Sequence, residues 1–348
     1  MEPAVTEYRA GIVGVGSRTV HGDQWARTLA GIPNVRLLRL ADEEPDALER
    51  TAKAVGVEHT SPDPRSVLEA DDLDIVVVNT VDHLHAEQVN AALDAGKHVL
   101  TDKPLGVSTA EAAGIASKAK SEGLKVAVGQ VYRFAPHYEF LKERVERGEL
   151  GRIFQVEAGY VHDLRPIWKA TPWRTDPSNP QNPWFGGALH PIDMVHWIGG
   201  EIEQVCALEN KASKVEEFPI NDNALILLKF ASGAIGRVWS TFGIRQNPGF
   251  QTFRNTFGDL GSCWANAIRN EVELHVSWGV DGVGGPMLVP FSGGANPNLA
   301  CVLDFLAAIE SDGTPRSDAN QAVRNMVVLE AAIASVESGR FEPVTPPG

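Results

Sequence analysis

The sequence is poor in cysteine and in long apolar runs, and each shortage excludes a class of protein. Its 348 residues include three cysteines, Cys206, Cys263 and Cys301, and no CxxC pair. This usage argues against a disulfide framework or a cysteine-based zinc site and favours reduced thiols in the cytoplasm. No apolar run is long enough to cross a bilayer. Residues 1–9 carry no apolar segment, so we expect no signal peptide and a cytoplasmic location.

Positive charge is also scarce. The chain has 31 Lys and Arg against 45 Asp and Glu, a formal net charge of -14, and no basic cluster. Such a surface repels phosphate backbones, so we expect neither a nucleic-acid partner nor binding to anionic membranes. An apolar content of 43% is ordinary for a globular protein, and the length suits two domains.

The first 131 residues alternate short apolar runs with helical patterns. We expect strands over 10–15, 35–41, 75–79, 98–101 and 125–130, where Val, Ile and Leu are frequent. Helices are expected over 19–29, 45–55, 83–95 and 108–122, the last opening with the capping box Ser108–Glu111. This alternation predicts an α/β fold, a doubly wound domain with a parallel sheet buried on both faces.

After residue 131 the pattern changes. Helices are expected over 136–147, 188–198, 298–309 and 318–338, and strands over 153–162, 205–212, 224–230, 234–241 and 272–276. The segment Phe230–Ala234 predicts a hairpin turn. Residues 168–183, rich in Pro, Asn and Trp, are expected to form a long ordered loop over a site. We therefore expect domains at 1–131 and 132–348, the second an α+β domain with an open, mainly antiparallel sheet.

A glycine pair follows the first predicted strand. In the segment Gly14-Val-Gly16-Ser17-Arg18, the glycines allow a tight turn and let backbone amides approach a pyrophosphate at a helix N-terminus. Thr19 stands where a third Gly or Ala is usual, so the match to the dinucleotide motif is imperfect and a simple turn remains the alternative.

Asp42 ends the second predicted strand, within the expected interval of the glycine pair. A carboxylate there accepts the ribose hydroxyls of NAD and repels the 2′-phosphate of NADP, so we expect NAD to be preferred. The neighbouring Glu43 and Glu44 strengthen this expectation. The alternative role for Asp42 is to cap the following helix. Arg39, the nearby cation, should point away from the strand end.

Several later motifs resemble the Gfo/Idh/MocA oxidoreductase family, which includes inositol dehydrogenases and glucose–fructose oxidoreductases. The resemblance covers essentially the whole chain. It rests on the glycine turn, on Thr80-Val-Asp-His83-Leu-His85, on Asp102-Lys103-Pro104, on Tyr132-Arg133, on His190-Pro-Ile-Asp193 and on Phe230-Ala-Ser-Gly. It implies a Rossmann domain followed by an α+β domain whose open sheet forms a homodimer or homotetramer.

The resemblance also implies site residues. Lys103 corresponds to the family's lysine and His190 to its histidine, and both would hold the reacting hydroxyl, with Asp193 as the third catalytic residue. Pro104 would follow a cis peptide bond. Cofactor-binding residues would be Gly14, Gly16, Ser17, Arg18, Asp42, Thr80, His83, His85, Asp102 and Lys103. Substrate-binding residues would be Tyr132, Arg133, Tyr160, His162, Arg165, Trp173, Arg174 and His190.

The chain departs from the family pattern in three places. Asp102 replaces a glutamate before the lysine, and Val81 replaces a proline. More importantly, Gly186 stands where the family has an aspartate, four residues before the histidine. Asp193 could orient His190 instead, or Asp163 or Asp176 could supply a carboxylate from the long loop.

A metal site is not expected. His190, Asp193 and His196 are spaced by threes, but His196 falls about 120° away from His190 around a straight helix. The tryptophans Trp168, Trp173, Trp184 and Trp197 could stack on a sugar ring, although core packing explains each of them equally well.

Three functions remain open. The first is an NAD-dependent dehydrogenase or reductase acting on a secondary alcohol of a sugar, polyol or related compound. The second is a redox-neutral glycosidase or lyase that oxidises, eliminates and reduces with one tightly held NAD. The third is a non-catalytic NAD-binding regulatory protein, against which the presence of both Lys103 and His190 argues.

Overall fold

The computed structural model describes residues 6–16, 22–176, 182–211, 220–244, 251–268, 271–278, 287–292 and 296–346. Contacts divide the chain into two compact units. The first contains Met1–Val131, Lys169–Trp173 and Asn296–Val323, and the second contains the remainder. We predicted a first domain of residues 1–131. The first unit also contains the two later segments, which that prediction left in the second domain.

A parallel sheet forms the centre of the first unit. Its strands are β1 (Tyr8–Val13), β2 (Val35–Ala41), β3 (His59–Ser61), β4 (Ile75–Val78), β5 (His98–Thr101) and β6 (Val126–Val128), in the order β3-β2-β1-β4-β5-β6. Every neighbouring pair is parallel. Because the order reverses between β1 and β4, their carboxyl ends border the point where such sheets bind nucleotides. The predicted Rossmann architecture is confirmed.

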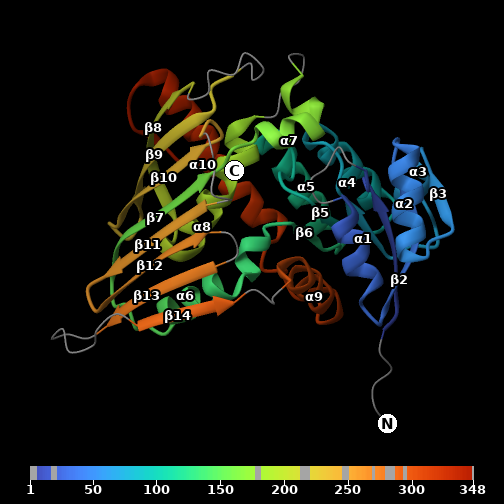
Figure 1. The fold of residues 1–348 in the computed structure, drawn as a ribbon, viewed down its shortest axis with the longest axis horizontal. Helices are drawn as coiled ribbons and strands as arrows, with labels where there is room; N and C mark the ends of the chain where they lie inside the picture. Colours follow the sequence, from blue (N-terminus) through green and yellow to red (C-terminus); the bar gives the residue numbers. More distant parts are fainter. Residues whose placement is uncertain are drawn as a thin grey trace, which may run out of the picture. The chain divides into compact units, whose positions relative to one another are not determined.

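The helices of the first unit fall into two packing groups (Figure 1). α1 (Gly22–Ala30) contacts α2 (Pro45–Val55) and α9 (Pro297–Glu310). α4 (His85–Asp94) contacts α3 (Arg65–Leu68) and α5 (Thr109–Glu122). The Ser108 hydroxyl caps α5 by accepting from the Glu111 amide, and the Glu111 carboxylate reaches back to the Val107 amide, one residue before the N-cap amide that a capping box uses. Two groups of helices against one sheet explain why β4 is buried along its whole length.

The second unit contains a mixed, mostly antiparallel sheet. Its described strands are β7 (Ile153–Val161), β8 (Ile202–Asn210), β9 (Asn223–Phe230), β10 (Ile235–Thr241), β11 (Gln251–Gly258), β12 (Gly261–Ile268), β13 (Glu271–Trp278), β14 (Met287–Ser292) and β15 (Glu342–Pro343). They run in the order β14-β13-β12-β11-β7-β10-β9-β8-β15 (Figure 1). β7 and β10 are parallel, whereas the other neighbouring pairs are antiparallel. The expected sheet is confirmed, including the hairpin between β9 and β10.

Helices cover one face of this sheet. α8 (Leu189–Gly199) packs on β7 and β10, and α6 (Pro136–Glu146) packs on α8. Burial alternates along β9, where Ile226 and Leu228 are buried but Leu225 and Leu227 are 39% and 45% exposed. The second face is therefore open to solvent at β9. No described helix, including the long α10 (Ala319–Ser338), has the length and apolar character needed to cross a bilayer.

The segment expected as a long loop is largely helical where it is described, so that prediction was wrong. It contains the end of α7 (Arg165–Ala170) and the 3-10 turn η3 (Pro172–Thr175), and the π-helical turn η4 (Trp184–Ala188) follows it directly, while residues 177–181 lie outside the described part. The physical reason lies in the prolines, because a fixed φ suits the first turn of a helix. Pro166 is the second residue of α7, and Pro172 is the first residue of η3.

Candidate functional site

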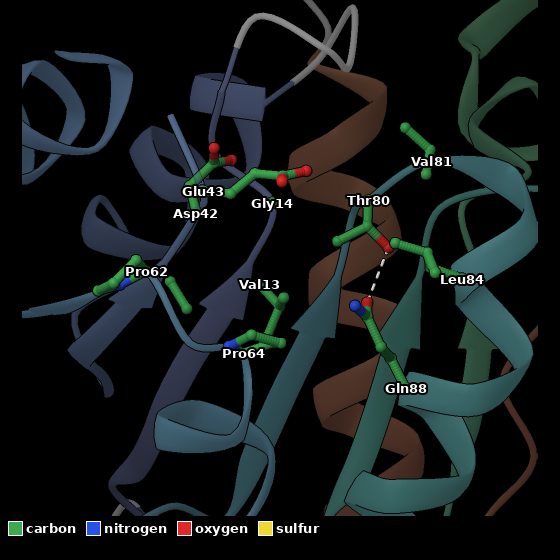
Figure 2. A pocket seen from close by; sticks show the side chains of 11 residues that line it. Val13, Gly14, Asp42, Glu43, Pro62, Pro64, Thr80, Val81, Leu84 and Gln88 are labelled. Carbon is green, nitrogen blue, oxygen red and sulfur yellow. Dashed lines mark hydrogen bonds between the residues drawn. The ribbon is translucent and has the colours of Figure 1, made fainter. Parts of the chain in front are cut away.

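A pocket of about 210 Å³ opens at the carboxyl edge of the parallel sheet, within the first unit. Figure 2 shows Asp42 and Glu43 on one side of it, close to Gly14, and Thr80, Val81, Leu84 and Gln88 on the other. Pro62 and Pro64 complete the wall next to the acidic side. The pocket therefore lies between the turn after β2 and the turn after β4, where a doubly wound sheet binds nucleotides.

The glycine turn has the close approaches that require glycine. Gly14 has a φ of +90°, and a Cβ placed on it would lie 2.2 Å from the Asn79 carbonyl oxygen. A Cβ on Gly16 would lie 2.7 Å from the Asp42 carboxylate. Ser17 and Arg18, which were predicted to contact the cofactor, lie outside the described residues. The turn up to Gly16 therefore directs backbone amides toward Asp42.

Asp42 organises this turn. One carboxylate oxygen accepts from the amides of Val15 and Gly16 at 2.7 and 2.6 Å, and the other accepts from the Glu44 amide at 2.8 Å. Glu44, which makes no side-chain cap, is the N-cap residue of helix α2, so Asp42 is not. Arg39 points away and pairs with Asp72, with Nε 2.8 Å from the carboxylate. The pocket edge therefore carries negative charge from Asp42 and Glu43.

The turn after β4 holds Thr80 against helix α4. The Thr80 hydroxyl donates to the Gln88 side-chain oxygen at 2.7 Å (Figure 2), and both residues line the pocket. His83 is exposed on η1 (Asp82–Leu84). His85 differs, because its ring is 1% exposed and its two nitrogens lie 2.7 Å from the Pro104 oxygen and 3.0 Å from the Thr80 oxygen. Those contacts do not agree with the cofactor-binding role predicted for His85.

Lys103 lies directly beyond the carboxyl end of β5. It is half-buried, and its amide donates to the Asp102 carboxylate at 2.9 Å. The peptide bond between Lys103 and Pro104 is cis, as the resemblance implies. Because β5 neighbours β4, the Lys103 turn and the pocket-lining Thr80 turn belong to adjacent strand ends of one sheet. This is the sheet edge where α/β enzymes bind ligands.

In the second unit, His190 lies within a group of rings. The His190 ring stacks on Tyr160, with centroids 5.4 Å apart at 15°, and meets the edge of Tyr132 at 4.8 Å. Tyr160 also stacks near His162 at 6.0 Å. Burial raises the pKa of Tyr160 strongly, against the opposing charge of Arg174, and burial lowers the pKa of His162. Tyr160 therefore keeps its proton at neutral pH. Four of the predicted site residues lie together here, namely Tyr132, Tyr160, His162 and His190.

Asp193 belongs to a different cluster from His190. Both of its carboxylate oxygens accept from Arg133, at 2.8 and 2.7 Å, and one also accepts from the Asn325 amide at 2.6 Å. These are its hydrogen bonds among the described residues, and none goes to His190. Arg133 and Asp193 are 3% and 0% exposed as side chains. The two residues are thus bonded to each other in the interior, and the substrate-binding and catalytic roles predicted for them stay predictions.

The cluster continues toward the surface through His196. The Asn325 oxygen lies 3.2 Å from Nδ1 of His196, and Glu201 lies 3.3 Å from Nε2. Asn325 is completely buried on α10 and connects Asp193 to His196. Sequence reasoning missed Asn325 because a single polar residue in an apolar helix does not identify its partner. It also missed Asn79. A polar residue directly after the apolar run of β4 was a signal that could have identified it.

The structure also describes Asp163 and Asp176, the other candidates to replace the family aspartate, and Gly186, which stands at its position. Asp163 accepts three hydrogen bonds from Arg165, through the Arg165 amide and guanidinium, so both residues are engaged with each other. Asp176 is exposed. Gly186 is buried in the π-helical turn, where its amide donates to the Asn182 oxygen at 2.8 Å. Trp173 and Arg174 lie half-buried on η3.

Metal ligation finds no support in the described part of the chain, where no three His, Cys, Asp or Glu side chains are grouped to hold an ion. The dinucleotide, in contrast, fits the residues present. The glycine positions leave room that a Cβ would fill, and Asp42 sits beside the pocket with its carboxylate fixed by amides. A fixed acceptor next to a glycine turn is the arrangement that binds ribose and pyrophosphate.

Comparison with known proteins agrees with this geometry. Residues 8–130 match the model of the NAD-binding Rossmann fold of the GFO_IDH_MocA oxidoreductase family, and residues 138–263 match the model of the GFO/IDH/MocA C-terminal domain. Levoglucosan dehydrogenase of Pseudarthrobacter phenanthrenivorans is 28% identical over 70% of this chain and 67% of its own. The scyllo-inositol 2-dehydrogenase (NAD(+)) of Bacillus subtilis is 27% identical over 76% of this chain and 75% of its own.

Solved structures share the fold. A levoglucosan dehydrogenase in complex with NADH superposes with a TM-score of 0.87 at 22% identity, over 98% of this chain and all of that one. An oxidoreductase from Agrobacterium radiobacter with NAD+, L-tartaric acid and magnesium gives 0.84 at 17% identity, over 97% and 99%. The two family models together span most of the sequence, and the sheet orders described above are those of a Rossmann domain and an open-sheet domain. The chain belongs to the Gfo/Idh/MocA family of NAD-binding oxidoreductases.

Proposed function

We propose that this protein is an NAD-dependent oxidoreductase that acts on a secondary alcohol of a sugar, polyol or related compound. The observation that carries the proposal is the position of Lys103, half-buried beyond the carboxyl end of β5 and one strand away from the nucleotide pocket. Relatives that are sugar and inositol dehydrogenases support the substrate class.

The first unit would hold the cofactor. Gly14 and Gly16 would admit the pyrophosphate to backbone amides, and Asp42 would accept the ribose hydroxyls. Negative charge at Asp42 and Glu43 favours NAD over NADP, because a 2′-phosphate would be repelled. When bound, NAD supplies the redox chemistry, and the protein supplies orientation and proton transfer.

We assign the proton chemistry to Lys103 and His190. Lys103 would take the proton of the alcohol as its carbon is oxidised, and His190 stays the second predicted catalytic residue. Tyr160, stacked on the His190 imidazole, and Tyr132, packed edge-on against it, would fix the plane of that ring. Arg133 and Asp193 would act as positioning residues that hold α8, the helix carrying His190, through a buried ion pair. Tyr132, Tyr160, His162, Arg165, Trp173 and Arg174 remain the candidates for substrate contacts.

A redox-neutral glycosidase or lyase is the second candidate. The observation that favours it is Gly186, buried in a π-helical turn where the family has an aspartate. Without that carboxylate, the usual set of proton-transfer groups is incomplete, which suits a reaction whose net outcome is elimination instead of oxidation.

A single assay separates these functions. Purified protein is incubated with NAD and a panel of sugars, polyols and glycosides, while NADH absorbance and product masses are followed. Net NADH formation supports the dehydrogenase, and release of the aglycone without net NADH supports the redox-neutral enzyme. NAD binding without turnover on any panel member, or full turnover by Lys103→Ala, would contradict the proposal.

We also propose that the open sheet face joins two copies of this chain. Leu208, Leu225 and Trp239 are paired in a cross-strand row over β8, β9 and β10, and they are 69%, 39% and 37% exposed. Such a row of exposed apolar side chains is typical of an interface. The variant Leu208→Glu/Leu225→Glu should reduce the mass measured by light scattering, whereas Leu303→Glu on α9 should not. An unchanged mass in the first variant would contradict this interface.

A further inference from the structure

His85 is buried between two turns that the proposed reaction uses. It is the first residue of α4, its ring is 1% exposed, and its nitrogens lie 2.7 Å from the Pro104 oxygen and 3.0 Å from the Thr80 oxygen. Pro104 directly follows Lys103, and Thr80 lines the nucleotide pocket. One ring therefore bridges the strand ends of β4 and β5 at the sheet edge that carries the candidate site.

The chemistry of these contacts makes them specific for histidine. A carbonyl oxygen only accepts hydrogen bonds, and a neutral imidazole carries one N–H, so a neutral ring donates to one of the two oxygens, whereas a protonated ring donates to both. A ring with nitrogens on two edges can reach both oxygens, which an apolar ring of similar size cannot do. Because the ring is buried, losing its N–H would leave a main-chain oxygen of one turn without its hydrogen-bond partner. The two turns would then be free to separate.

We propose that His85 is a positioning residue for Lys103, and that its ring fixes the Lys103–Pro104 turn against the Thr80 turn. The inference rests on the proposed function, since it gives Lys103 the proton chemistry. His85 itself touches neither substrate nor cofactor, because both of its nitrogens face main-chain oxygens of the protein. Misplacing a reacting group by about 1 Å can lower a rate by ~10²-fold, so this bridge has a measurable kinetic consequence.

The chain offers a matched control in His98. His98 is the first residue of β5, at the end of the strand opposite Lys103, and its Nδ1 accepts from the Lys125 amide at 3.0 Å. It is thus also a partly buried histidine bonded to the main chain of the same sheet. The variant His98→Gln should lower the melting temperature but leave turnover unchanged, because its contact is remote from the Lys103 turn.

The test compares His85→Phe, which keeps a ring but removes its N–H donor and its second ring nitrogen, with His85→Gln, which restores an amide donor. We expect kcat to fall by about 10²-fold in His85→Phe and by less in His85→Gln, with NAD affinity unchanged in both. Hydrogen–deuterium exchange, which requires no substrate, should show faster exchange over residues 101–107 in His85→Phe but not in His98→Gln. A role in packing alone would make His85→Phe the milder of the two variants.

The outcomes separate this inference from the proposed function. Wild-type kcat and unchanged exchange over residues 101–107 in both His85 variants would overturn the positioning role, even if Lys103→Ala is inactive. A large loss of NAD affinity in His85→Gln, with kcat preserved, would overturn it in favour of cofactor binding. Full turnover by Lys103→Ala would instead overturn the proposed function. Should His85→Phe fail to fold, His85→Gln and its exchange pattern still decide the question.

Discussion

The carboxyl edge of the parallel sheet and the region around α8 hold their polar residues in different ways. At the sheet edge, Asp42, Thr80 and Lys103 follow strand ends and remain beside a pocket or half-exposed. Around α8, Arg133 and Asp193 are buried and bonded to each other. Polar side chains at the sheet edge of the first unit therefore remain accessible to a ligand. In the second unit, Arg133 and Asp193 bond to each other and stabilise the fold.

The largest effect on stability is expected for the buried pair Arg133 and Asp193, which tests the difference between the two regions. Arg133→Met leaves Asp193 as a buried charge without its main partner, so the free energy of unfolding should fall by about 3–5 kcal/mol. Urea unfolding measures this loss. The double variant Arg133→Met/Asp193→Leu should recover part of it, because no isolated charge remains. A single variant as stable as the wild type would show that the pair is not structural.

The next effect concerns the sheet edge. Asp42→Ala removes the acceptor of three backbone amides and of the proposed ribose contact, so NAD affinity should fall by about 10–100-fold, as expected for hydrogen bonds to a charged group. NADP affinity should fall less, because the repulsion of its phosphate is also removed. Titration of intrinsic fluorescence with both cofactors gives the ratio. Asp46→Ala, an exposed neighbour on α2, serves as the control and should bind NAD normally.

A smaller effect should appear on acidification. Burial lowers the pKa of His98 and of His162 in the folded chain. The unfolded chain therefore binds more protons than the folded one below its own histidine pKa of about 6.5, and stability decreases as the pH falls through that range. Thermal melts between pH 8 and pH 5 should show this decrease. It should be weaker in His98→Gln, and an equal slope in that variant would contradict the account.

The smallest stability effect is expected at Arg165. Its pair with Asp163 is partly exposed, at 31% and 13% of the side chains, and such pairs contribute only about 0–1 kcal/mol. Arg165→Ala should therefore leave the melting temperature nearly unchanged while raising the KM for any substrate that Arg165 contacts. A loss of stability as large as that of Arg133→Met would remove the distinction between the two arginines.

The sequence predicted the first unit well because strand ends are local features. The apolar run of β4 and the glycine pair after β1 determine where Thr80 and Gly14 lie, whatever the rest of the chain does. Asp193 could not be predicted in this way, because its partners Arg133 and Asn325 are 60 and 132 residues away. The turn η3 was missed because Pro172, which begins it, was interpreted as a loop residue.

The central claim is that Lys103 governs hydride transfer between a sugar or polyol carbon and NAD. The most direct measurement uses the panel compounds deuterated at their secondary alcohol carbons and follows the label into the nicotinamide ring by mass spectrometry. The account predicts that at least one compound labels the cofactor with the wild type, and that Lys103→Ala binds NAD equally well but transfers no label. Equal labelling by Lys103→Ala would contradict it.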